Sequence, residues 1–223
     1  MRRRLAEANP SNAAWQRDLS VNHVEVGDVR LNQGDLSGAL EAYGESLKVS
    51  RRLGETDPSN AAWQRGLSVS HERIGNVRLA QGDLSGALDA YGESLQARRR
   101  LREVDPSNAV WQRDLSVSQE RIGYVLQAQG DLSGALDACG ESLQVRRRLA
   151  EADPSNAGWQ RDLSVSLIRI ALLKEQQDGR SEALPHAEEA LTITERLAVL
   201  DPSNAAWQKD VDNMRPIVTR LRG

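Results

Sequence analysis

The chain has 223 residues, and its 29 Lys and Arg against 32 Asp and Glu give a formal net charge of −3. This balance gives no electrostatic reason to expect nucleic acid as a partner or binding to an anionic membrane. No run of eighteen apolar residues occurs, so the sequence predicts no membrane-spanning helix, and the basic start MRRRLAEANP lacks the apolar stretch of a signal peptide. The one cysteine, Cys139, cannot form an intramolecular disulfide, so we expect a reducing, cytoplasmic location.

A repeat of 48 residues organises the whole sequence. Residues 61–108 and 109–156 differ at ten positions, which leaves 38 identities in 48. We therefore predict one domain over 1–223 with repeats 13–60, 61–108, 109–156 and 157–204, preceded by a fragment, Met1–Asn12, and followed by a capping helix at 205–223. The markers of the period are Trp15, Trp63, Trp111, Trp159 and Trp207, with Pro10, Pro58, Pro106, Pro154 and Pro202.

Each repeat is predicted to form two helices of about 20 residues, here called its first and second helix. In the second repeat, Asp57 and Pro58 are expected to begin the first helix, as N-cap and first helical residue. Gly82 is expected to end it in a left-handed conformation. The second helix is predicted over 84–104 and has two adjoining apolar stripes, so it should be packed between two neighbours.

Some glycines and one proline fall inside these predicted helices. Gly44, Gly92 and Gly140 share one register of the second helix, where Gly costs about 1 kcal/mol relative to Ala. Either a neighbouring helix approaches closely there, or the glycines descend from one duplicated unit. The last segment, 205–223, fits a polar cap that Pro216 is expected to kink.

The central part of each repeat resembles the tetratricopeptide repeat. The residues that carry the resemblance are Ile74, Gly75, Gly82, Asp83, Ala87, Leu88, Tyr91, Leu95, Asp105 and Pro106. The resemblance implies an all-α fold, an α–α superhelix (right-handed solenoid) of antiparallel helix hairpins, in which Gly75 packs against Ala87. The family's period is about 34 residues, so this chain looks like an elongated variant.

Few residues suggest catalysis or metal binding. His23 and His71 share a register, but too few other ligands converge with them, so we expect no metal, no cofactor and no enzyme activity. Cys139 replaces Tyr91 of the preceding repeat on a packing stripe, and we expect a buried, small apolar side chain. The Arg clusters at 51–52, 98–100 and 146–148 are interpreted as solvated helix ends, with an anionic partner surface as the alternative.

The face of the first helices opposite the tryptophans is the candidate binding surface. Its residues diverge between repeats more than the rest of the unit, apart from a recurring Arg, and include apolar side chains. The tryptophans themselves are expected to point away from it, into the stack. In the resembling family these positions line a groove that holds an extended peptide or a partner helix. The predicted groove comprises Arg17, Val24, Asp28, Leu31, Arg65, Glu72, Asn76, Leu79, Arg113, Glu120, Tyr124, Gln127, Arg161, Ile168, Leu172 and Glu175.

The sequence therefore predicts a non-catalytic scaffold that binds a protein or peptide. Two alternatives stay open at this point. One is a self-assembling structural solenoid, with a homo-oligomer formed through the N-terminal edge. The other is a sensor or regulatory array cut from a larger multidomain signalling protein.

Overall fold

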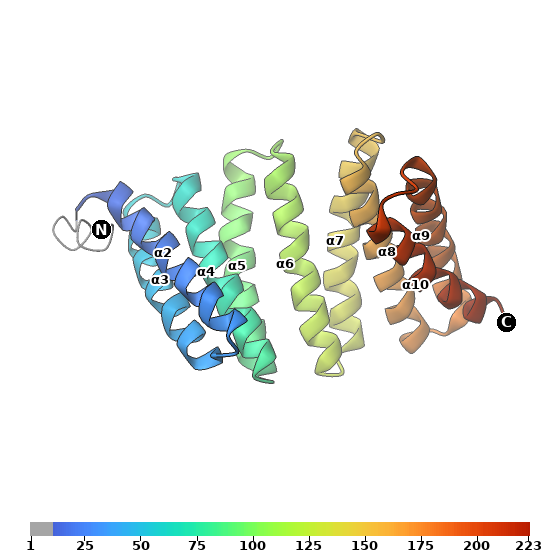
Figure 1. Ribbon diagram of the computed structural model, residues 1–223, viewed down its shortest axis with the longest axis horizontal. Helices are drawn as coiled ribbons and strands as arrows, with labels where there is room; N and C mark the ends of the chain where they lie inside the picture. The colour runs from blue at the N-terminus through green and yellow to red at the C-terminus, as the bar shows by residue number, and fades with distance from the viewer. Residues whose placement is uncertain (1–10) are drawn as a thin grey trace. The chain divides into compact units, whose positions relative to one another are not determined.

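The computed structural model describes residues 11–223, and within that range it contains nine α-helices and no strand (Figure 1). Two helices correspond to each of the four repeats, and one helix follows them. Their bounds are α2 Ala13–Asn32, α3 Leu36–Thr56, α4 Ala61–Ala80, α5 Leu84–Val104, α6 Ala109–Ala128, α7 Leu132–Ala152, α8 Ala157–Gln177, α9 Arg180–Leu200 and α10 Ala205–Arg222.

The chain divides within α6 into two compact units, Met1–Val125 and Leu126–Gly223. In the first unit α3 packs against both α2 and α4, and α5 packs against α4. In the second unit α8 packs against both α7 and α9, and α9 also packs against α10. The fold is an all-α solenoid of antiparallel helix hairpins, as predicted. Of the predicted N-terminal fragment Met1–Asn12, residues 1–10 lie outside the described part of the chain.

The first helices begin later than the sequence analysis expected. The N-cap of α4 is Asn60, whose side-chain oxygen accepts from the backbone N–H of Ala62 (3.1 Å) and of Trp63 (3.3 Å). Asp57 instead follows the end of α3, and its carboxylate accepts from Ser59, so Pro58 lies in the turn between the helices. The prediction of an Asp57 cap was wrong because this carboxylate holds the turn, which leaves the free N–H groups of α4 to Asn60.

The turn between the two helices of a repeat follows the prediction. Gly82 has φ +78°, the left-handed conformation that glycine adopts at low cost. Asp83 then caps α5 by accepting a hydrogen bond of 2.9 Å from the N–H of Gly86.

At the other end of the chain, α10 continues through Pro216 as one helix.

The second helices can approach the first helices closely because glycine makes room for a tyrosine ring. A Cβ atom at Gly75 of α4 would lie 2.7 Å from Cε1 of Tyr91, whose side chain is fully buried in α5. Gly27 faces Tyr43 in the same way. In contrast, a Cβ at Gly92 would meet no atom within 4 Å, and the same holds for its counterparts in the other two repeats. The close approach predicted there is wrong, and the descent alternative remains.

This difference between two helical glycines can be tested by matched substitutions. Gly75→Ala should lower the free energy of unfolding by about 1–3 kcal/mol, because the methyl group overpacks the site of the Tyr91 ring. Gly92→Ala should raise it by about 0.5–1 kcal/mol, because alanine has the higher helix propensity and finds open space. Urea unfolding followed by circular dichroism measures both, and equal effects would contradict this packing.

His71 is the most buried of the described histidines and packs among charged neighbours. It is 6% exposed on α4. Burial lowers the pKa of His71, while the nearby Glu93 raises it and Arg51 lowers it further. The imidazole is therefore kept neutral in the folded chain at a pH where the unfolded chain takes up a proton.

The stability of the chain should consequently fall with acidification. The unfolded His71 titrates near its ordinary pKa of about 6.5, so below that pH the unfolded state binds more protons and is favoured. His71→Gln removes the titrating group, so the urea midpoint should become less sensitive to pH between about 7.5 and 5.5. Gln is chosen because Gln119 occupies this register in the third repeat. An unchanged pH dependence in this variant would contradict the burial of a neutral imidazole.

Candidate functional site

The sixteen residues of the predicted groove all lie on the first helices α2, α4, α6 and α8 (Figure 1). The structure places them in three different situations. Some line a pocket, some are held in polar contacts with other parts of the chain, and some pack against buried clusters.

A pocket of about 180 Å³ lies between α2 and α4 in the first unit. It brings together three predicted groove residues, Arg17, Val24 and Arg65. Two serines come from α2 and α3, and the remaining lining is mostly apolar. The full lining is Arg17, Ser20, Val21, Val24, Ser50, Leu53, Ala62, Trp63, Arg65, Gly66 and Val69.

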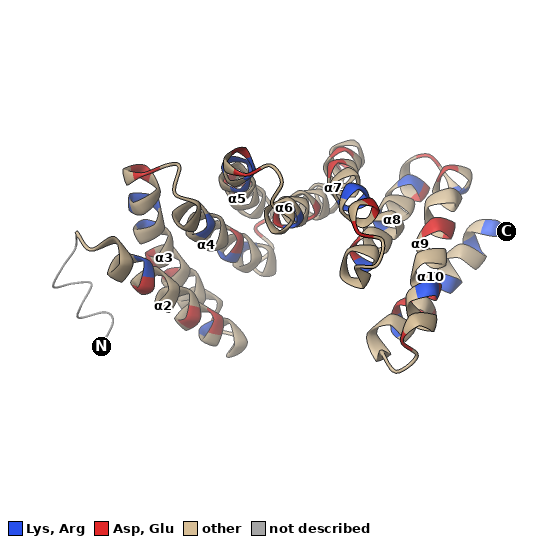
Figure 2. Ribbon diagram, turned by 90° about the horizontal axis from the view of Figure 1, so that it is seen from above, with Lys and Arg blue, Asp and Glu red and all other residues tan. Residues whose placement is uncertain are grey.

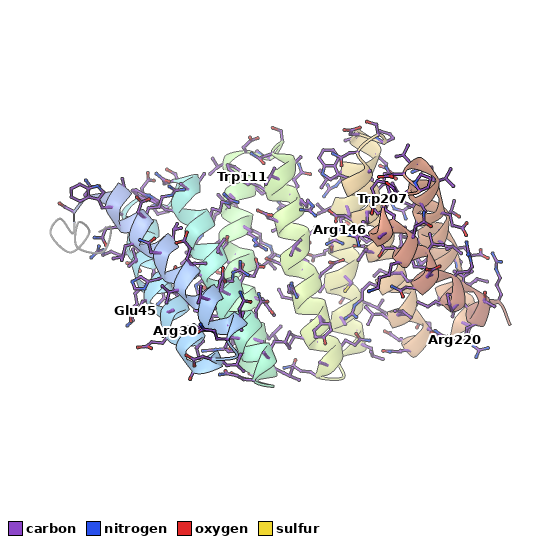
Figure 3. The ribbon with its side chains drawn as sticks, in the orientation of Figure 1. Arg30, Glu45, Trp111, Arg146, Trp207 and Arg220 are labelled. Carbon is purple, nitrogen blue, oxygen red and sulfur yellow. The ribbon has the colours of Figure 1, made fainter. Side chains whose placement is uncertain are left out.

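Trp63 lines this pocket, which corrects the prediction that the tryptophans point away from the groove residues. It is partly buried, as are the four other tryptophans. In the second unit Trp159 and Trp207 pack beside a buried cluster that includes Leu163 and Leu197 (Trp207 is labelled in Figure 3). The tryptophan is the third residue of each first helix and of α10, so it lies in the first turn.

The arginine of the pocket register behaves differently in the last repeat. Arg161 of α8 forms a two-bond ion pair with Asp210 of α10, with Nε–Oδ2 at 2.6 Å and Nη2–Oδ1 at 3.3 Å. The hydrogen bond from Arg161 to Asp210 also raises the pKa of the guanidinium. Neither Arg17 nor Arg65 forms an ion pair with any residue in 11–223.

Two of the divergent polar residues are partners of buried tyrosines. The hydroxyl of Tyr43 donates to Asp28 (2.6 Å), and that of Tyr91 donates to Asn76 (2.7 Å). Where the third and fourth repeats have Cys139 and Ala187 in place of these tyrosines, the first helix carries Tyr124 and Leu172 in place of the acceptors. Sequence analysis missed this joint change, although the paired substitutions across repeats were its signal.

Other predicted groove residues are held in contacts within their own unit. Glu72 pairs with the buried Arg98 of α5, and Glu175 of α8 pairs with Arg220 of α10 (labelled in Figure 3). Gln127 does not line the pocket. Its side-chain amide donates a hydrogen bond to Gln176 (2.9 Å). These contacts hold neighbouring helices together.

The apolar groove residues are partly structural. Leu31 packs against the buried cluster of Tyr43, and Leu79 packs against the cluster of Ala87 and Tyr91. Ile168 packs against two clusters in the second unit. Tyr124, by contrast, is 50% exposed. The predicted groove therefore includes side chains that stabilise the fold as well as side chains that line the pocket or are exposed.

The arginine clusters are not simply solvated helix ends. Arg98 and Arg146 are about 5% and 4% exposed, and each donates to a backbone carbonyl of a neighbouring first helix. The acceptors are Asp114 O (2.8 Å) and Asp162 O (3.0 Å), so the first arginine of the 98–100 and 146–148 clusters helps to join two helices (Arg146 is labelled in Figure 3). Acidic and basic residues both occur on helices of each unit (Figure 2).

The described residues offer no arrangement for metal chemistry. Within 11–223 no three His, Cys, Asp or Glu side chains lie close enough together to hold a metal ion. Cys139 is buried beside Ala135 and Leu173, as predicted for a small apolar side chain. In the same part of the chain no helix is both long and apolar enough to cross a membrane.

The tyrosine pairing can be tested by a double-mutant cycle. Tyr91→Phe and Asn76→Leu should each lower the free energy of unfolding, and the double variant should lose less than the sum. We expect a coupling of about 1 kcal/mol, the net worth of one hydrogen bond within the fold. Urea unfolding measures it, and additive effects would show that the two side chains do not interact.

Comparison with known proteins agrees with this architecture. The family model described as tetratricopeptide repeat matches residues 117–155. The matched segment runs from within α6 through α7. No curated protein sequence matches the chain.

Two solved structures are similar to the chain over most of its length. BtubC (BKLC) from P. vanneervenii has a TM-score of 0.65 at 16% identity, over 99% of this chain and 85% of that one. A Podospora anserina protein, described as a kinesin light chain with nearly identical TPR-like repeats, has a TM-score of 0.60 at 11% identity, over 93% of this chain and 97% of that one. At such identities the likeness concerns the fold.

Proposed function

We propose that this helical repeat protein of the tetratricopeptide type is a non-catalytic scaffold, which binds an extended peptide or a partner helix along its first helices. The observation that carries the proposal is the pocket between α2 and α4. Its lining combines apolar side chains with two arginines, as expected of a surface that receives side chains from a partner. The tetratricopeptide family generally mediates protein interactions, which agrees with this use.

A valine that lines the pocket recurs at the same register of the other first helices. Val21 and Val69 line the pocket, and Val165 occupies the same register of α8 in the second unit. Val21 is 41% exposed and Val165 is 37% exposed, although the register lies on a packed helix. A valine recurs at this register in every repeat, exposed in the first and fourth and partly buried in the second and third, which favours a contact surface over a solvated one.

The other functions considered from the sequence find less support. Self-association through the N-terminal edge and a sensor role in a larger protein stay predictions, since no contact among the described residues favours either. We also propose a reducing, cytoplasmic location, because a sequence with one cysteine cannot form an intramolecular disulfide.

Paired charge substitutions test which surface binds. Val21→Asp with Val165→Asp should abolish capture of partner proteins from a lysate of the native host, because interface energy concentrates in a few central contacts. The free energy of unfolding should change by less than about 1 kcal/mol, since both side chains are substantially exposed. Affinity capture with quantitative mass spectrometry gives the measurement.

The control variant carries the same chemistry at another surface. Val104→Asp with Val199→Asp changes two exposed valines near the C-terminal ends of α5 and α9, with exposures of 52% and 79%. This variant should capture the same proteins as the unmodified chain. The proposal is refuted if the first pair folds and still captures every partner, or if the control pair is the one that loses them.

A further inference from the structure

We propose that the pocket between α2 and α4 recognises an Asp or Glu side chain of a peptide together with an adjoining apolar side chain. This inference rests on the proposed function and specifies the partner's chemistry at one site. It starts from a position where one repeat lacks a carboxylate that the others have.

One register of the first helices, and of α10, is acidic everywhere except in the second repeat. Gly66 occupies this position on α4 and lines the pocket. A carboxylate at this position would face the preceding first helix, as the carboxylate of Asp210 on α10 does. The acidic counterparts are Asp18, Asp114, Asp162 and Asp210.

The ion pair of Arg161 with Asp210 shows what a carboxylate at this register can do. The two residues are 49 positions apart, and the same separation leads from Arg17 to Gly66. Arg17 therefore occupies the position that corresponds to Arg161, but residues 11–223 place no carboxylate in an ion pair with it. Arg65 and Asp114 share the register and form no ion pair within 11–223, so the register permits the pair without enforcing it.

The electrostatics of the pocket are unbalanced as a result. Its lining includes two arginines, Arg17 and Arg65, and no carboxylate among the described residues. The first turn of α4 also contributes Ala62 and Trp63, and a helix N-terminus favours a negative charge. A carboxylate that enters from a partner can form the charge-assisted hydrogen bonds that Asp210 forms with Arg161.

The apolar half of the pocket selects a second group beside the carboxylate. Val21, Val24, Leu53, Trp63 and Val69 line it, and an apolar side chain placed against them would be removed from water. The volume of about 180 Å³ is below the range of about 300–1,000 Å³ typical of small-molecule sites. The pocket therefore suits side chains of a bound peptide.

A single substitution can restore the missing carboxylate within the chain. A Cβ at Gly66 would lie 3.4 Å from Oγ of Ser50, an ordinary contact, so the position accepts a side chain. In the Gly66→Asp variant, the new carboxylate should form an ion pair with Arg17 and so compete with the carboxylate of the peptide. Gly66→Asn is the matched control, because it has nearly the same shape and no charge.

The probe is a fluorescein-labelled, C-terminally amidated peptide, Gly-Leu-Asp-Leu-Gly, titrated with the full chain by fluorescence polarisation. A peptide with Asn in place of Asp is the reference, and an Asn peptide with a free C-terminal carboxylate tests that other source of charge. We expect the Asp peptide to bind about fivefold or more tightly than the amidated Asn peptide. Gly66→Asp should weaken Asp-peptide binding about fivefold or more, and Gly66→Asn should change it less than about twofold.

Several outcomes would overturn the inference. These are no binding of the Asp peptide up to about 1 mM, equal affinity for the Asp and amidated Asn peptides, or equal effects of the two Gly66 substitutions. Tight binding of the free-carboxylate Asn peptide would assign the pocket to a chain end. If sedimentation shows that Gly66→Asp dissolves an oligomer, the occupant is a second copy of the chain.

The failure of this inference differs from the failure of the proposed function. If the valine pair Val21→Asp and Val165→Asp loses the native partners while Gly66→Asp keeps them, the scaffold function stands and the carboxylate preference is refuted. If the valine pair keeps its partners, the proposed function itself fails.

Discussion

The structure depends on the close packing of second helices between first helices, which small side chains make feasible. Ala39, Ala87 and Ala183 are fully buried at one register of α3, α5 and α9. Buried serines join neighbouring helices directly, as in the contacts of Ser20 with Ser46 (2.9 Å) and of Ser46 with Ser70 (2.8 Å). Because the second helix uses its surface for packing on two sides, the first helices have more surface left for a partner.

Periodicity predicted the extent of the helices well. The candidate capping residues predicted the helix starts less well. The predicted range 84–104 coincides with α5, because two apolar stripes define that helix along its whole length. The start of α4 was misplaced because both Asp57 and Asn60 can accept backbone N–H groups. Which of them caps the helix depends on the path of the turn, and composition alone does not specify that path.

The candidate site was predicted in part, for a related reason. Its helices and its face were derived from the repeat, and the structure brings Arg17, Val24 and Arg65 together in one pocket. The variability of Asp28 and Asn76 had a different cause, since each is the acceptor of a buried tyrosine hydroxyl. A divergent position can therefore follow a change elsewhere in the same hairpin, and variability alone does not distinguish that from contact with a partner.

Comparison of the repeats with one another separates these two causes. At the Asn76 position, the hydrogen-bond acceptor and its tyrosine change together. The first two repeats have an acceptor and a tyrosine, and the fourth repeat has Leu172 and Ala187 instead, so both partners of the contact are replaced. At Gly66 the carboxylate is lost while the arginine opposite, Arg17, is kept. A joint change is accounted for by the contact between the two positions and needs no partner to explain it. A change on one side alone leaves a charged group at an open pocket, and the free energy of pairing that group remains to be gained from another molecule.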